Sequence, residues 1–270
     1  MKKTVLPLLF FTTLIFIGCG SDAPKNGKVK LEFNAFKDQT LKINYTFSVH
    51  SLSNGDVTTF EMLLSGTGKK NEDGTSTLEL KNDNINMKGN LQGQTINGSA
   101  SGPDSVAGDA KLVAMPVFAF LGKSYRSIYN AQLDKKSEVQ MNGNDIVDSS
   151  ENKMQLYLHY PSTEIGVGDT WKKELLIKSG NKMNCSAIYS LREIKGDTAI
   201  ISIEGPLDGK GESFGNEFTI NGKLDGMFMV DMKTGWPMES DIQQDFTLKM
   251  GGKDIPMKYS INCKVEPSIH

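Results

Sequence analysis

The chain has 270 residues, 38% of them hydrophobic, which is enough to bury a core in one large domain or two small ones. Its 30 Lys and Arg against 32 Asp and Glu give a formal net charge of −2, with the two signs interspersed. The sequence has no cluster of basic residues of the kind that binds nucleic acid, so we expect no nucleic-acid partner.

The first 18 residues have the form of an export signal that ends at a cysteine. Two lysines precede an apolar run over residues 5–17, which is too short to cross a bilayer as a mature helix. Gly18 lets a peptidase approach the backbone, and Cys19 supplies a thiol that can accept a diacylglycerol. Phe16 departs from the leucine usual at that position. We predict a lipoprotein signal peptide at 1–18 and lipidation of Cys19, including palmitate; the alternative is an ordinary secretory signal.

The residues after the cysteine predict where the protein is located and how it is connected to its lipid anchor. Gly20, rather than aspartate, follows the cysteine, which in many bacteria permits transfer to the outer membrane. We therefore expect a protein of the bacterial cell envelope, anchored on the periplasmic face or the cell surface. Residues 19–30 are small and polar and predict a flexible tether. A single β-rich domain should follow over 31–270. Two stretches share one hairpin pattern, so two related halves, 31–145 and 165–266, are the alternative.

Period-two alternation bounded by Gly, Asn and Asp turns dominates the chain and predicts antiparallel sheet. Apolar residues from Leu41 to Val49 alternate with polar ones, and after an SNGD turn the chain returns over 57–66. We predict a mostly β fold, either an antiparallel curved sheet or an incomplete β-barrel. The further strands are expected at 77–80, 85–88, 125–133, 138–141, 170–178, 183–193, 199–204, 214–231, 240–250 and 256–265.

One stretch, residues 110–121, has the pattern of a helix, which Asp109 can cap and Pro116 would kink. It is apolar on nearly all sides, so we expect it to lie against the concave face of the sheet. A second short helix is predicted within 143–160. Flexible methionines cluster in the last hairpins and suit varied hydrophobic guests, although core filling explains them as well. The predicted ligand cavity is lined by Leu112, Met115, Phe118, Phe120 and Met229.

Two cysteines remain once Cys19 is lipidated, in a compartment that can be oxidising. Cys185 and Cys263 each share the parity of apolar neighbours in a strand-like run, so both thiols should point into one core. We predict a disulfide between them. The alternative is two reduced cysteines that pack as small hydrophobic side chains.

No catalytic or metal-binding motif stands out, and we predict no catalytic residue, no metal and no cofactor. The three histidines lie far apart, and no G-x-S-x-G, H-E-x-x-H or phosphate-binding glycine loop is present. Paired carboxylates can hydrolyse glycosides, but acids in turns more often cap backbone N–H groups. Trp236 lies in a turn, where its indole either stacks on a sugar or packs on the sheet. The acids at predicted strand ends are Asp169, Asp231, Glu239 and Asp241.

Three motifs carry a resemblance to a known family. V-G-D-T-W at 167–171, the D-x-K-T-G-x-P turn at 231–237 and F-L-G-K at 120–123 resemble a family of predicted bacterial lipoproteins, catalogued as domain of unknown function 6263. The resemblance extends from about Leu41 to Val265 and implies a β-rich envelope lipoprotein, without site residues. The D-x-K-T-G-x-P turn is also similar to that of half-barrel lipoprotein carriers, which hold acyl chains in a cavity roofed by helices.

These observations predict a non-enzymatic envelope lipoprotein that contacts the membrane through its lipid and binds a hydrophobic or lipidic ligand. An alternative is a structural module that presents its edge strands to another envelope protein. A glycan-directed enzyme that uses the strand-end acids is the third hypothesis.

Overall fold

The computed structural model describes residues 27–35, 40–91, 94–98, 121–143, 145–148, 157–178, 182–213 and 216–268. The predicted signal peptide, Cys19 and all of the predicted helix except Leu121 lie outside these residues. No helix within the described ranges has the length and apolar character needed to span a membrane.

Every regular element in the described ranges is a β-strand, as the alternation predicted. The strands are β1 (Lys28–Val29), β2 (Thr40–Ser51), β3 (Val57–Lys70), β4 (Ser76–Leu91), β5 (Gln94–Gly98), β6 (Ser124–Tyr129), β7 (Lys135–Asn142), β8 (Asp145–Asp148), β9 (Ile165–Gly166), β10 (Thr170–Lys178), β11 (Lys182–Lys195), β12 (Thr198–Ser213), β13 (Asn216–Asp231), β14 (Trp236–Met250) and β15 (Lys253–Ser268).

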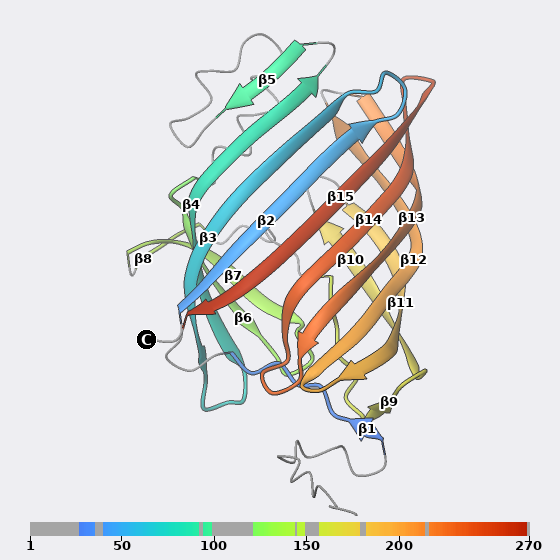
Figure 1. Cartoon of the computed structure of the whole chain (residues 1–270). Coiled ribbons are helices and arrows are strands. Elements are labelled where there is room, and N and C mark those ends of the chain that lie inside the picture. Colours follow the sequence, from blue (N-terminus) through green and yellow to red (C-terminus); the bar gives the residue numbers. More distant parts are fainter. Residues whose placement is uncertain are drawn as a thin grey trace, which may run out of the picture.

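Thirteen of these strands form one antiparallel sheet, which is strongly curved but not closed into a barrel (Figure 1). Its order is β10-β11-β12-β13-β14-β15-β2-β3-β4-β6-β7-β8, and β5 pairs with β4. The last strand, β15, pairs with β2, in register from Met257 opposite Ser51 to Ser268 opposite Thr40. The N-terminal and C-terminal parts of the chain therefore share a single sheet.

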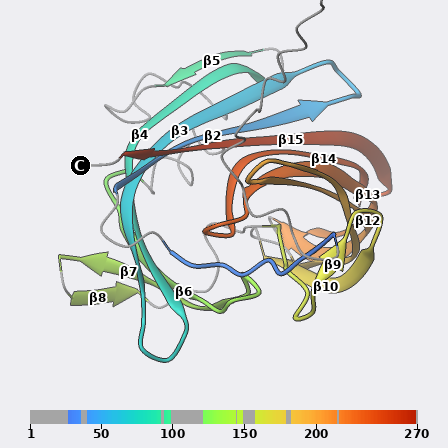
Figure 2. The ribbon, with the colours of Figure 1, turned by 60° about the horizontal axis from the view of Figure 1, so that its bottom comes forward.

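The sheet curls most tightly at β10 to β14, as Figure 2 shows from below. Glycines on the inner face of these strands explain the tight curl. A Cβ atom on Gly222 would lie 2.2 Å from the carbonyl oxygen of Asp245, and one on Gly205 would lie 2.5 Å from that of Ser186. Side chains at these positions would push neighbouring backbones apart, and glycine removes that obstacle.

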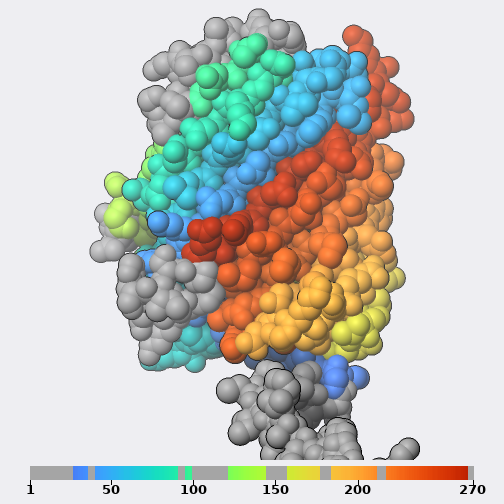
Figure 3. All heavy atoms as spheres, in the orientation of Figure 1, coloured from blue at the N-terminus to red at the C-terminus, as the bar shows by residue number. Residues whose placement is uncertain are grey.

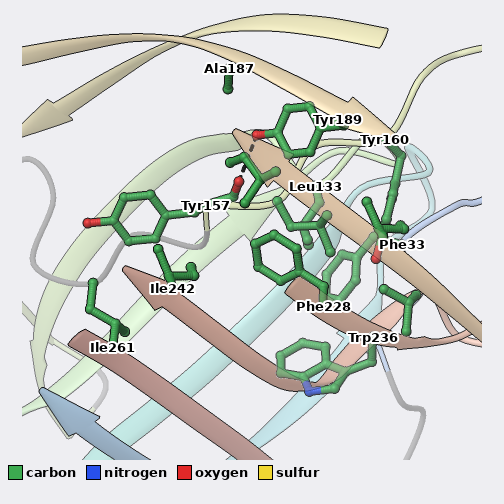
Figure 4. Close-up of a cluster of buried hydrophobic side chains, with 14 of the residues drawn as sticks. Phe33, Leu133, Tyr157, Tyr160, Ala187, Tyr189, Phe228, Trp236, Ile242 and Ile261 are labelled. Carbon is green, nitrogen blue, oxygen red and sulfur yellow. Dashed lines mark hydrogen bonds between the residues drawn. The ribbon is translucent and has the colours of Figure 1, made fainter. Parts of the chain in front are cut away.

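The lower end of the sheet in Figure 1, which we call the base, consists of the turns at 71–75, 130–134, 196–197 and 232–235. Two segments without regular structure, 31–35 and 157–160, fill it. Phe33 N donates to the Ala131 carbonyl at 2.8 Å, and Tyr160 N donates to that of Gln132 at 2.9 Å. Phe33 and Tyr160 are fully buried in the core that Figure 4 shows. These two segments therefore close the sheet at the base.

Two sequence expectations need correction, and a third is tested only in part. Lys28 and Val29, assigned to the tether, form β1 and pair with β9 at Gly166 and Ile165. The two strands predicted at 77–80 and 85–88 are one strand, β4. Of the range 143–160, where a second short helix was predicted, residues 145–148 are strand β8 and residues 157–160 are not helical, whereas residues 149–156 lie outside the described residues.

Candidate ligand-binding site

The motif turn at 231–237 is part of the base. Thr234 Oγ1 donates to the Asp231 carboxylate at 2.6 Å, and Gly235 N donates to the Asp231 carbonyl at 2.7 Å. The Tyr160 hydroxyl donates to the Gly235 carbonyl at 2.6 Å. Trp236 is only 1% exposed and packs on Phe33, with ring centroids 5.1 Å apart. Packing, rather than sugar stacking, is therefore the role of this indole.

The strand-end acids do not converge. Asp169 accepts a hydrogen bond from Gly166 N at 2.8 Å, so it caps a turn at the base, as Asp231 does. Glu239 and Asp241 lie exposed on the outer face of β14. Within the described part of the chain, no three acidic, histidine or cysteine side chains are grouped so that they could hold a metal ion. The acids thus give the glycan-enzyme hypothesis no support.

A partly buried carboxylate connects the two ends of the sheet at the base. Asp134 Oδ1, in the β6–β7 turn, lies 2.9 Å from Lys173 Nζ on β10 and 2.9 Å from His159 Nδ1. Burial opposes ionisation, but the hydrogen bonds from His159 and Lys173 outweigh it and hold the pKa of Asp134 well below its usual range. Trp171, stacked on Tyr189, donates to the His159 carbonyl at 2.8 Å. We call Asp134, His159 and Lys173 the clasp, because their contacts hold the β6–β7 turn against β10.

The upper end of the sheet, which we call the rim, carries the turns at 52–56 and 251–252. Toward the rim, the inner face of the neighbouring strands β14, β15 and β2 is apolar, and the side chains on it are only partly buried. Two edge-to-face contacts connect the strands: Phe47 with Tyr259 at 5.2 Å, and Tyr259 with Phe246 at 4.8 Å between ring centroids. We call this surface the rim wall; it comprises Phe47, Val49, Leu248, Met250, Met257 and Tyr259.

A buried polar group lies directly below the rim wall. Gln244 is 1% exposed, points inward between Ile242 and Phe246, and pairs across the sheet with Tyr259. Its Nε2 donates to the Tyr157 hydroxyl at 3.2 Å. The Tyr157 carbonyl in turn accepts a hydrogen bond from the Tyr189 hydroxyl at 2.7 Å, drawn as a dashed line in Figure 4. We call Gln244 and Tyr157 the polar floor.

Beside the polar floor is a cavity of about 30 Å³. Its lining includes the three tyrosines Tyr45, Tyr129 and Tyr157 together with Ser240 and Cys263, and most of its other described lining residues are apolar. Because this volume is close to that of one water molecule, it admits a small group but no acyl chain. Among the described residues, the rim wall is the inward-facing apolar surface that remains partly exposed and long enough for an acyl chain.

Met229 does not lie on the concave face, where the cavity was predicted, but together with Met227 it lines an open hollow of about 460 Å³. Met229 is 41% exposed on the outer face of the sheet, as is Met227 at 50%, because Phe228 and Val230 occupy the inward positions of β13. Figure 3 shows the outer face, on which β2, β15, β14 and β13 lie side by side. The other predicted cavity residues, Leu112, Met115, Phe118 and Phe120, lie outside the described residues.

The described end of the predicted helix is close to the rim wall. Leu121 packs against a small buried cluster of Phe60, Ile85, Met87 and Ile96, and so do Phe47 and Val49 of the rim wall.

Both cysteines have the inward direction that their parity predicted, but they are free thiols in the structure. Cys185 lies on β11 and Cys263 on β15, with three strands between them, so the predicted bridge is not formed. Burial raises the pKa of Cys185 to about 11 and that of Cys263 to about 12. Both thiols therefore stay protonated at neutral pH.

The sequence prediction missed the polar floor. Gln244 follows Ile242 and precedes Phe246 at a spacing of two, which places an amide on the apolar parity of its strand. That position is the signal that could have found it. Tyr157 had no comparable signal, because in the alternating run from Met154 to Tyr160 it shares the parity of the polar residues Gln155 and His159.

The described part of the chain is thus all β. It is built on one curved antiparallel sheet, which segments 31–35 and 157–160 close at the base and which carries the apolar rim wall toward its other end. Residues 130–237 match the model of a family of unknown function, DUF6263. The match confirms the resemblance over these residues, which is less than the predicted extent. It includes the clasp and the motif turn at 231–237, both at the base. No curated protein matches the chain.

Proposed function

We propose that this chain is a non-enzymatic lipoprotein of the bacterial cell envelope, anchored in the outer membrane, and that it binds a hydrophobic or lipidic ligand. The observation that carries the proposal is the rim wall. Its six apolar side chains face the concave side of the sheet and keep part of their surface accessible. An alkyl chain laid on such a surface gains about 0.8 kcal/mol for each methylene removed from water.

The anchor is tested at Cys19. Cys19→Ala should abolish metabolic labelling with palmitate and release the protein from the membrane fraction. Continued membrane partitioning of the variant would contradict lipid anchoring at this cysteine. This part of the proposal stands on the sequence of residues 1–20.

The ligand site is tested with two methionines on opposite faces. Met257→Gln places a polar amide on the rim wall, whereas Met227→Gln makes the same change on the outer face. Native mass spectrometry of the purified chain should find co-purified lipid in the wild type and in Met227→Gln, and less in Met257→Gln. Displacement of a fluorescent fatty acid should show the same order. Equal binding by both variants would remove the rim wall as the site.

A second candidate function is a protein-interaction module that uses a sheet edge. In the described ranges β10 pairs only with β11, and its Leu176 is 44% exposed. An unpaired strand edge can accept a strand from a partner. Failure of the wild-type protein to bind any lipid, together with loss of a cross-linked envelope partner in Leu176→Pro, would favour this module.

A further inference from the structure

The amide of Gln244 is incompletely hydrogen-bonded in a buried place. Nε2 reaches the Tyr157 hydroxyl, but Oε1 accepts no hydrogen bond from any described residue. Buried amides nearly always find partners for their polar atoms, because leaving one unpaired costs free energy. An unpaired amide atom that is 99% buried and lies below an apolar wall therefore indicates a polar ligand group.

The direction of Tyr157 agrees with this reading. Its ring is turned away from Phe33, Tyr160 and Trp236, and its hydroxyl lies on the side opposite to that cluster (Figure 4). The same tyrosine lines the cavity of about 30 Å³. The cavity thus offers room for one small polar group next to Tyr157, and the rim wall offers an apolar surface for a chain.

The charge of the site restricts that polar group. The described residues that line the cavity carry no formal charge. Burial raises the pKa of Tyr157 to about 12 and also raises that of Tyr45, so both phenols are neutral at neutral pH. A carboxylate or phosphate placed here would lose its hydration without gaining a cation. An anionic head is therefore disfavoured.

A hydroxyl meets all of these requirements. It donates to an amide oxygen and accepts from an amide nitrogen, so it suits Gln244 in either orientation of the amide. We infer that the ligand is an uncharged amphiphile with a hydroxyl head, such as a long-chain alcohol or a monoacylglycerol, whose hydroxyl binds Gln244 and Tyr157 and whose chain lies on the rim wall. This inference rests on the proposed function and specifies its ligand class.

The test compares ligands that share a twelve-carbon chain and differ in the head. The full chain carrying Cys19→Ala, which has no lipid of its own, is loaded with the neutral apolar dye N-phenyl-1-naphthylamine. Dodecanol should displace the dye at a concentration at least tenfold lower than dodecanoate or dodecane does. Equal displacement by dodecanol and dodecane would overturn the inference, because the head would then contribute nothing.

Two neighbouring glutamines provide a matched pair of variants. Gln244→Leu should raise the dodecanol concentration needed to displace the dye about tenfold, to that of dodecane. Gln243→Leu, on the outer face of the same strand, should behave like the wild type. Tyr157→Phe keeps the ring, and thermal melting confirms that each variant is folded. A preference for dodecanol that survives in both Gln244→Leu and Tyr157→Phe would overturn the inference.

The same experiment distinguishes an error in the ligand class from an error in the proposed function. If dye and all three ligands bind with no preference for the alcohol, the ligand class is wrong and the hydrophobic site remains. If neither the dye nor any ligand binds the wild-type chain, the proposed function and the ligand class are both overturned.

Discussion

The sharpest prediction concerns Gly235, in the motif turn at the base. Its φ is 64°, and a Cβ atom added there would lie 2.1 Å from the Glu32 carbonyl oxygen and 2.9 Å from Phe33 N. Contacts below 3.0 Å do not occur for real Cβ atoms, so Gly235→Ala must displace the segment 31–35. The displacement breaks the 2.7 Å hydrogen bond from Asn34 N to the Thr234 carbonyl. It also disturbs the one from the Tyr160 hydroxyl to the Gly235 carbonyl.

The magnitude follows from these losses. Left-handed backbone strain in alanine contributes about 1 kcal/mol. Each disrupted hydrogen bond contributes about 1 kcal/mol more, so Gly235→Ala should lower the free energy of unfolding by about 3 kcal/mol. For a protein of this size, that corresponds to a fall of roughly 6–12 °C in Tm.

Gly196 provides the control, because it has a similar φ of 56° but no atom within 4 Å of an added Cβ. Gly196→Ala should carry only the strain, about 1 kcal/mol. Urea unfolding followed by tryptophan fluorescence measures both variants, since Trp236 is buried next to the first site. If Gly235→Ala costs no more than Gly196→Ala, the packing of residues 31–35 against this turn is refuted.

The Asp134 clasp and the two free cysteines give two further predictions. The pKa of Asp134 is lowered by His159 and Lys173, so its stabilising effect is present above the unfolded-state pKa of about 3.9 and is lost as the pH falls through the folded-state value. Asp134→Asn should therefore lower the urea midpoint at pH 7, and its difference from the wild type should shrink below about pH 4; a constant difference would contradict the clasp. Cys185 and Cys263, whose pKa values are raised by burial, should react slowly with a thiol reagent at pH 8 in the folded protein. Denaturation without reductant should expose both thiols, and exposure of neither would show that the bridge predicted from the sequence does form.

The sequence by itself determined which parts of the chain become strands. Alternation from Leu41 to Val49, and its counterparts later in the chain, is a local property of an extended backbone, because successive side chains point to opposite faces. The short strands β1, β5, β8 and β9 were missed, since two to five residues are too few to show a period.

The tertiary structure alone decided which face of some strands points inward. Met227 and Met229 alternate with Phe228 and Val230, so both faces of this part of β13 are apolar and parity cannot choose between them. Core packing makes the choice, because Phe228 and Val230 fill the interior and leave both methionines exposed. The candidate site had the same difficulty.

The rim wall combines β2 with β14 and β15, which only the long-range pairing of β15 with β2 brings together. The polar floor adds Tyr157, from a segment that the base holds in place through Tyr189. The sequence therefore determined the strands, because their period is local. The tertiary structure decided the site, because it depends on contacts between residues that lie far apart in the chain.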